Sequence, residues 1–308
     1  MRVTQSMLSN NMLRNLNSSY GKMSNYQNML TSGRKFNKPS EDPVAAVVGM
    51  GYRVDLGKNE QYQRNLSTAN SWLDSTDSAF NEVGSALTRV KELIVQAAND
   101  TNGKERQKIN AEMKQIKESL RDVGNTQIAG NYIFSGTHVD QPLYTDKISP
   151  QNPAITTLGK EKNIEIDVFD GIRMSVNTPG AELFGELDDF MAHVIATLDD
   201  DTKTSDEVSA ALGLQVTDGG GATIPALDSI HEKTLKLQAD VGARQNRVEL
   251  MGNRLKIGEE HATKQMSLNE DTEYPETITN MVTQESIHQA ALSVGAKIIQ
   301  QTLVDFIR

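Results

Sequence analysis

Apolar residues recur at alternating steps of four and three positions along the stretch 62–97. Such a heptad seam is typical of a helix that packs against partner helices. Because no proline lies between Val44 and Asp100, we expect one continuous helix over about 42–99. At about 1.5 Å per residue this helix would be roughly 85 Å long. The seam consists of Tyr62, Leu66, Ala69, Leu73, Phe80, Val83, Leu87, Val90, Ile94 and Ala97, with Thr76 in the remaining slot.

The same spacing predicts further helices. Gly33 is placed to end the first helix, and Ser40 to cap the second, with Pro43 in its first turn. Gly49 and Gly51 fall inside a helical pattern, where they predict either close packing or a weak point of the helix. Pro275 interrupts the pattern between the last two helices. The expected helices span about 1–31, 104–127, 183–198, 223 to beyond 267, and 276–308.

Period-two alternation over 164–168 and 173–176, separated by Asp170 and Gly171, predicts a β-hairpin. A short strand is expected near 131–136. The pattern therefore predicts a mainly α fold: an elongated helical bundle or coiled coil built from the N- and C-terminal segments, with a small inserted β-containing outer domain. The expected divisions are terminal coiled-coil segments over 1–42 and 272–308, a helical rod over 43–135 and 223–271, and an outer domain (hairpin plus helix) over 136–222.

Both terminal helices carry thin apolar stripes that stay unsatisfied unless they meet a partner. A patch of that size left open would be unusual for a monomer. Burying one such side chain contributes about 1.5–3 kcal/mol, so a handful in each interface could hold a subunit in place. We therefore expect an assembly interface formed by Leu13, Leu16, Tyr20, Met23, Leu30, Ile278, Val282, Leu292, Ile299, Leu303 and Phe306.

Composition narrows the function classes. Hydrophobic residues make up 37% and aromatic residues 5% of the chain, as expected for long helices with narrow apolar stripes. The formal net charge of −10 argues against binding nucleic acid, which needs a basic face. No apolar run is long enough to span a membrane, and the polar first ten residues contain no cleaved secretory signal.

Candidate chemistry is absent from the sequence pattern. With no cysteine, the chain has no disulfide, thiolate nucleophile or cysteine zinc ligand. The five histidines show no metal-binding spacing, and no nucleophile motif occurs. The acidic run 199–201 lacks the spaced oxygens of a calcium loop. We expect no catalytic residue, metal or cofactor, which leaves a structural protein or a cytoplasmic coiled-coil signalling rod.

Two segments favour the structural protein. Residues 30–43 read LTSGRKFNKPSEDP and resemble the N-terminal signature of the bacterial flagellin superfamily, while 241–249, VGARQNRVE, resemble its C-terminal counterpart. Three features are closer to the hook-associated junction proteins of that superfamily than to flagellin. They are the segment 39–43 in place of an alanine-rich run, the segment 130–136 that leads into the outer domain, and the chain end over 303–307.

This resemblance implies a fold in which the N- and C-terminal segments pair as an inner tube inside a helical bundle. It implies export through the flagellar type III apparatus without a cleaved signal, to an extracellular place in the bacterial flagellum. The implied function is a structural adaptor that joins hook to filament by axial packing of its terminal helices. The implied partners are further copies in a ring, a neighbouring hook-associated protein, flagellin on the filament side and an export chaperone. The alternative is flagellin itself, the bulk filament subunit.

Overall fold

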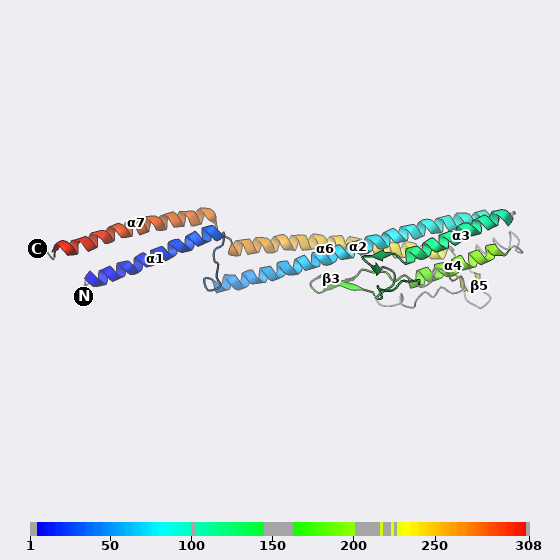
Figure 1. Cartoon of the computed structure of the whole chain (residues 1–308), viewed down its shortest axis with the longest axis horizontal. Coiled ribbons are helices and arrows are strands. Elements are labelled where there is room, and N and C mark those ends of the chain that lie inside the picture. Colours follow the sequence, from blue (N-terminus) through cyan, green and yellow to red (C-terminus); the bar gives the residue numbers. More distant parts are fainter. Residues whose placement is uncertain are drawn as a thin grey trace. The chain divides into compact units, whose positions relative to one another are not determined.

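The structure, a computed structural model, describes residues 5–99, 103–144, 163–200, 216–217, 223–224 and 227–305. Its long helices dominate the described chain and its sheets are small (Figure 1), which confirms the predicted mainly α fold with a β-containing insert. The helices are α1 (Gln5–Ser32), α2 (Pro43–Asn99), α3 (Gly103–Gly124), α4 (Ala181–Asp199), α6 (Leu227–Glu270) and α7 (Tyr274–Asp305). The strands are β1 (Gln127–Ile128), β2 (Asn131–Tyr132), β3 (Glu165–Phe169), β4 (Ile172–Ser175), β5 (Val216–Thr217) and β6 (Thr223–Ile224).

The chain forms two compact units. Unit 1 comprises Met1–Lys58 and Ile257–Arg308, and unit 2 comprises Asn59–Lys256. Both α2 and α6 contribute residues to each unit. The boundaries expected near 42 and 272, between the terminal segments and the rod, fall instead at helix ends. This division of the chain stays a prediction.

The predicted seam of α2 lies in the core of unit 2. Thr76, which occupies the polar slot, is fully buried and donates its hydroxyl to the Trp72 carbonyl at 2.8 Å. The bond satisfies the hydroxyl within the helix, so a polar residue is tolerated in the row. The buried seam residues are Leu66, Ala69, Leu73, Phe80, Val83, Leu87, Val90, Ile94 and Ala97.

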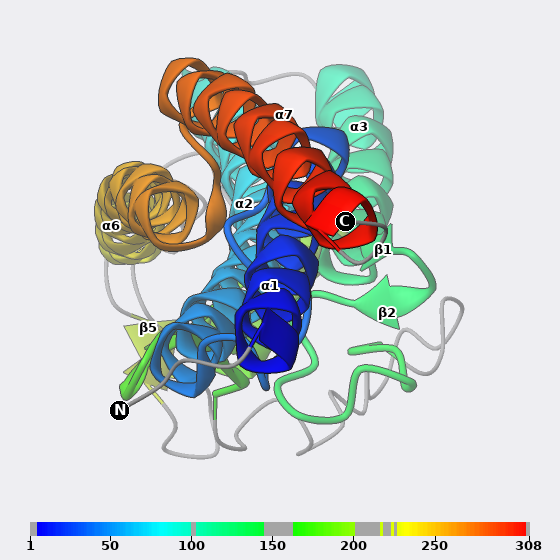
Figure 2. The same ribbon diagram turned by 90° about the vertical axis from the view of Figure 1, so that its left-hand side faces the viewer.

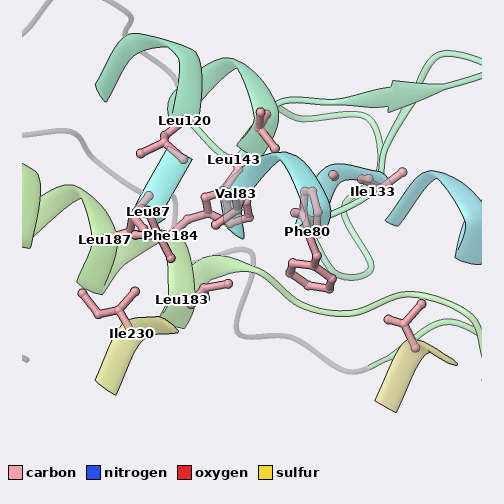
Figure 3. Packing of buried hydrophobic residues seen from close by; sticks show 14 of the residues in the cluster. Phe80, Val83, Leu87, Leu120, Ile133, Leu143, Leu183, Phe184, Leu187 and Ile230 are labelled. Atoms are coloured by element: carbon pink, nitrogen blue, oxygen red, sulfur yellow. The ribbon is translucent and has the colours of Figure 1, made fainter. Parts of the chain in front are cut away.

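Three aromatic rings join the insert to the helices of unit 2. The Phe134 ring, just after β2, lies 5.5 Å from Phe80 on α2 and 4.9 Å from Phe184 on α4. Figure 3 shows Phe80 and Phe184 in this core. Gly180 leaves room for this cluster, because a Cβ there would come within 2.8 Å of the Phe134 Cβ. The described part of the insert therefore shares one core with α2, α3 and α4.

A buried ion pair links α3 to α4. The Arg121 guanidinium donates to both oxygens of Asp188 at 2.8 and 3.1 Å, and Lys117 lies 3.5 Å from the same carboxylate. The hydrogen bond to Asp188 raises the pKa of Arg121, whereas burial lowers the pKa of Lys117. These partners compensate the cost of burying the carboxylate, so the pair fixes how the two helices face each other.

The predicted hairpin is formed by β3 and β4, which pair antiparallel around a turn at Gly171 with φ of +71°. Its tip packs on both long helices of unit 2, with the Phe169 ring 6.3 Å from Tyr62 and 4.3 Å below the Arg254 guanidinium. A second hairpin, β1–β2, was not expected. It turns at Ala129 and Gly130, both with positive φ, as in a type I′ turn.

The expected start of the second long helix near 223 is wrong. Thr223 and Ile224 form β6, paired with β5, and α6 is described from Leu227. Both residues are β-branched, which favours a strand over the first turn of a helix. Pro275 lies in the first turn of α7, where its missing N–H is tolerated, so α7 begins two residues earlier than expected.

Mutation of Phe134 can test whether the insert shares a core with the helices of unit 2. Replacing Phe134 by Ala removes a ring packed between two helices, so we expect unfolding free energy to fall by about 3–5 kcal/mol in urea titration. The control, Val95→Ala, truncates a side chain that is 54% exposed and should change stability by less than about 0.5 kcal/mol. Equal losses in the two variants would contradict a shared core.

Candidate assembly interface

The terminal helices α1 and α7 lie side by side and antiparallel within unit 1 (Figures 1 and 2). Gln284 on α7 donates to the Ser19 hydroxyl on α1 at 2.7 Å. The rings of Tyr20 and His288 lie 6.2 Å apart. The expected pairing of the two chain ends is therefore present within one subunit.

Gly295 allows α1 to approach α7 closely. A Cβ at this buried glycine would overlap the end of the Met12 side chain on α1. The missing side chain thus leaves the space that Met12 fills. The sequence pattern makes no prediction for Gly295, although a glycine beside Ala296 in a helix is a signal for close packing.

Five of the eight predicted interface residues whose burial is described are exposed, from 47% at Leu292 to 62% at Tyr20. Leu16, Met23 and Leu30 are partly buried. The exposed members of the set are Leu13, Tyr20, Ile278, Val282 and Leu292. Ile299 and Leu303 belong to α7, and Phe306 lies outside the described residues.

The signature segment 30–43 forms the elbow between α1 and α2. Gly33 adopts a φ of +72° and its N–H bonds the Met29 carbonyl at 2.8 Å, which ends α1 as predicted. The predicted cap of α2 at Ser40 is wrong. Asp42 accepts the N–H groups of Val44 and Ala45 at 3.1 and 2.9 Å, because its carboxylate stands immediately before the first turn.

The elbow is bonded to the break between α6 and α7. Lys35 donates its backbone N–H to the Glu270 carbonyl at 2.7 Å and its ammonium to the Leu268 carbonyl at 2.8 Å. The Thr272 N–H in turn bonds the Gly33 carbonyl at 2.9 Å. These bonds satisfy the last carbonyls of α6 and fix the end of α1 against the start of α7.

A buried carboxylate joins α6 to the first turns of α2. Glu270 forms an ion pair with Arg53, and Gly49 leaves the room that its carboxylate occupies. The Asn269 amide donates to the Ala45 carbonyl at 2.8 Å. The fit of the Glu270 carboxylate against Gly49 confirms that this glycine allows close packing. The Arg53–Glu270 pair gave no sequence signal, because its partners stand 217 positions apart.

Apolar side chains are distributed very unevenly between the units. Among the described residues of unit 1, Ala46 is the one buried hydrophobic side chain. Among the described residues, the exposed large hydrophobic side chains lie in unit 1 except Val95, Leu235 and Leu250. They include a group at the start of α2 that the sequence analysis left out, although its three–four spacing was readable: Val44, Val47, Val48, Met50 and Val54.

The described residues show no cluster of His, Asp or Glu side chains that could hold a metal ion. None of the described helices is both long enough and apolar enough to cross a membrane. Unit 1 therefore has the geometry of a packing surface. Hydrogen bonds connect the elbow (30–43) to the break between α6 and α7, and we call these two segments the joint. Apolar side chains are exposed on the helices.

A disulfide can test the α1–α7 pairing in the isolated chain, which contains no native cysteine. The Met12 side chain occupies the position of a Gly295 Cβ, with its Cγ 3.9 Å away, so the two backbones approach closely. A disulfide needs such closeness, with a Cβ separation of about 3.5–4.5 Å. We expect Met12→Cys/Gly295→Cys to oxidise to an intrachain disulfide, detected by mass spectrometry. Leu13→Cys/Gly295→Cys, with the first cysteine on the exposed side, should stay reduced. Equal oxidation of both variants would refute the observed register.

Comparisons with known proteins agree with this geometry. The bacterial flagellin N-terminal helical region matches residues 3–139, and the bacterial flagellin C-terminal helical region matches 224–307. Flagellar hook-associated protein 3 of Escherichia coli (strain K12) is 22% identical over 94% of this chain and 95% of its own length. Flagellin of Bacillus subtilis (strain 168) is 23% identical over 98% of this chain and 97% of its own.

A solved structure shares the fold. The crystal structure of flagellar hook-associated protein 3 from Legionella pneumophila covers 70% of this chain and 97% of the solved chain, with a TM-score of 0.58 and 14% sequence identity. The two matched regions take in α1, α2, α3, α6 and α7. The chain belongs to the bacterial flagellin family.

Proposed function

We propose that this chain is a structural adaptor of the bacterial flagellum, which joins hook to filament by packing its terminal helices against neighbouring subunits. One observation carries the proposal: the described part of unit 1 buries a single hydrophobic side chain and exposes many large ones. Unit 2 buries its apolar side chains in a core of its own. A unit that exposes so much apolar surface is suited to burial in an assembly.

The exposed side chains lie on paired helices and not on loops. Leu13 and Tyr20 on α1, and Ile278, Val282 and Leu292 on α7, recur at helical spacing along the pair. Each contributes about 1.5–3 kcal/mol when it leaves water, so several in each interface supply enough free energy to hold a subunit. The mechanism requires packing and no chemical step.

The partners follow from the family and from the names of the relatives. We infer further copies in a ring, a neighbouring hook-associated protein on the hook side and flagellin on the filament side, with an export chaperone before assembly. The place of action is the extracellular flagellum, reached without a cleaved signal. In this proposal segments 1–42 and 272–308 assemble, 43–135 and 223–271 form the rod, and 136–222 form the outer insert.

Flagellin remains a second candidate, because the Bacillus subtilis flagellin matches nearly the whole chain at an identity similar to that of the hook-associated protein. The two differ in where the chain would be found. A cysteine at the exposed position Ser78, labelled with a fluorescent maleimide, should mark one spot at the base of each filament. Labelling along the whole filament would establish flagellin and refute the adaptor.

A charge on the exposed stripe tests the proposal itself. Leu13→Asp should leave the urea unfolding of the isolated chain unchanged, because Leu13 is 54% exposed. When the variant is the only copy in the source bacterium, we expect hooks without filaments by electron microscopy, since each subunit loses an apolar contact and would have to bury a charge.

The matched control is Asn15→Asp, which adds the same charge to α1 about 200° further round the helix. This variant should still form filaments. Normal filaments with Leu13→Asp, at normal amounts of the exported chain, would contradict an assembly role for the stripe.

A further inference from the structure

The first turns of α2 carry an apolar face that no part of unit 1 covers. Val44, Val47, Val48 and Val54 are 41–73% exposed and share one side of the helix with Gly51. At about 100° per residue, this side lies opposite Gly49 and Arg53, which face Glu270. We call Val44, Val47, Val48, Gly51 and Val54 the α2 face.

The facing part of α6 has an outer side as well. Ile257 and Leu268 are 56% and 62% exposed, and His261 and Lys264 lie between them at steps of four and three. This side lies opposite the buried Glu270, which is turned toward α2. We call Ile257, His261, Lys264 and Leu268 the α6 face.

The two faces therefore lie on opposite sides of one two-helix layer. A symmetric dimer through either face would use that face on both copies and leave the other exposed. A head-to-tail contact, in which the α2 face of one copy meets the α6 face of the next, covers both faces and generates a ring when the rotation closes.

Shape favours this contact. Gly51 has no other atom within 4 Å of where a Cβ would be, so it leaves a hole in the α2 face between Val47, Val48 and Val54. Leu268 is the more exposed of the two large apolar side chains of the α6 face, and it fits such a hole as a knob.

Charge favours the same register. With Leu268 placed opposite Gly51 in an antiparallel approach, Asp55 falls opposite Lys264 and Lys58 falls close to Glu260. All four charged residues are exposed, and each pair joins opposite signs. The apolar knob and the two charge pairs thus select one alignment.

We propose that the α2 face binds the α6 face of a second copy of this chain, with Leu268 inserted over Gly51. The inference rests on the proposed function, because it supplies the lateral contact that a ring of adaptors needs. It adds a surface outside α1 and α7, and it assigns different faces to the two neighbours of each copy.

Cross-linking tests the contact, since the chain has no native cysteine. Val48→Cys/Leu268→Cys, expressed as the only copy in the source bacterium, is treated with a short bifunctional maleimide in isolated flagella. We expect a ladder of covalent multimers on denaturing gels. Val48→Cys and Leu268→Cys alone should give no multimers, because in a head-to-tail contact neither residue meets its own copy.

The matched control is Val48→Cys/Thr263→Cys, whose second cysteine is exposed but stands outside the α6 face; it should give no ladder. Multimers from a single-cysteine variant would indicate a symmetric contact and overturn the proposal. No ladder in flagella that contain the double variant would also overturn it, while the adaptor role would stand. Absence of the wild-type chain from flagella would refute both.

Discussion

Among the described residues, many large apolar side chains on α1, on α7 and at the start of α2 are exposed. Two helices packed side by side shield the strip between them and leave the rest of their surfaces in water. In unit 2 the helices α2, α3, α4 and α6 share one core, so their seams are buried. In unit 1 apolar side chains at the same helical spacing are exposed. The account of this protein depends on that difference, because the apolar surface that the described part of unit 1 exposes is open to another molecule.

The joint of unit 1 holds the helices that carry these exposed apolar side chains in a fixed orientation. The backbone of the elbow bonds the end of α6, and Glu270 fits beside Gly49 with Arg53 as its ionic partner. These contacts are polar and local, so they orient α1, α7 and the start of α2 without covering the apolar side chains. A surface held in position before binding loses less conformational freedom when a neighbour arrives. The polar joint and the apolar helices therefore have separate tasks in assembly.

Periodic patterns predicted most of the helices and the β3–β4 hairpin, because burial on one side of an element leaves a repeat in the sequence. The seam around Phe80 and the turn at Gly171 are examples. Contacts between distant residues left no such repeat. The fit of Met12 against Gly295, and of Glu270 against Gly49, depends on which residues the fold brings together. The helical pattern predicts close packing or a weak point at Gly49 and makes no prediction for Gly295, and it identifies neither partner.

Short elements were predicted less well, since few residues decide them. Serine suits the cap position, which favours Ser40 in the sequence, yet Asp42 stands nearer the first turn and accepts two of its N–H groups. The sequence pattern predicts a helix at Thr223, because β5, the pairing partner of β6, has only two residues and leaves no periodic signal. The apolar group at the start of α2 had readable spacing, but its exposure depends on α6 covering one side of that helix only.

Amide hydrogen exchange of the isolated chain, compared with the chain in intact flagella, tests the central claim most directly. Opening free energies report which helices are sheltered by packing and which are not. We predict strong protection of the unit 2 core in both samples, and weak protection of α1, α7 and the first turns of α2 in the isolated chain that becomes strong in the flagellum. Protection of those helices in the isolated chain equal to that of the core would contradict the account.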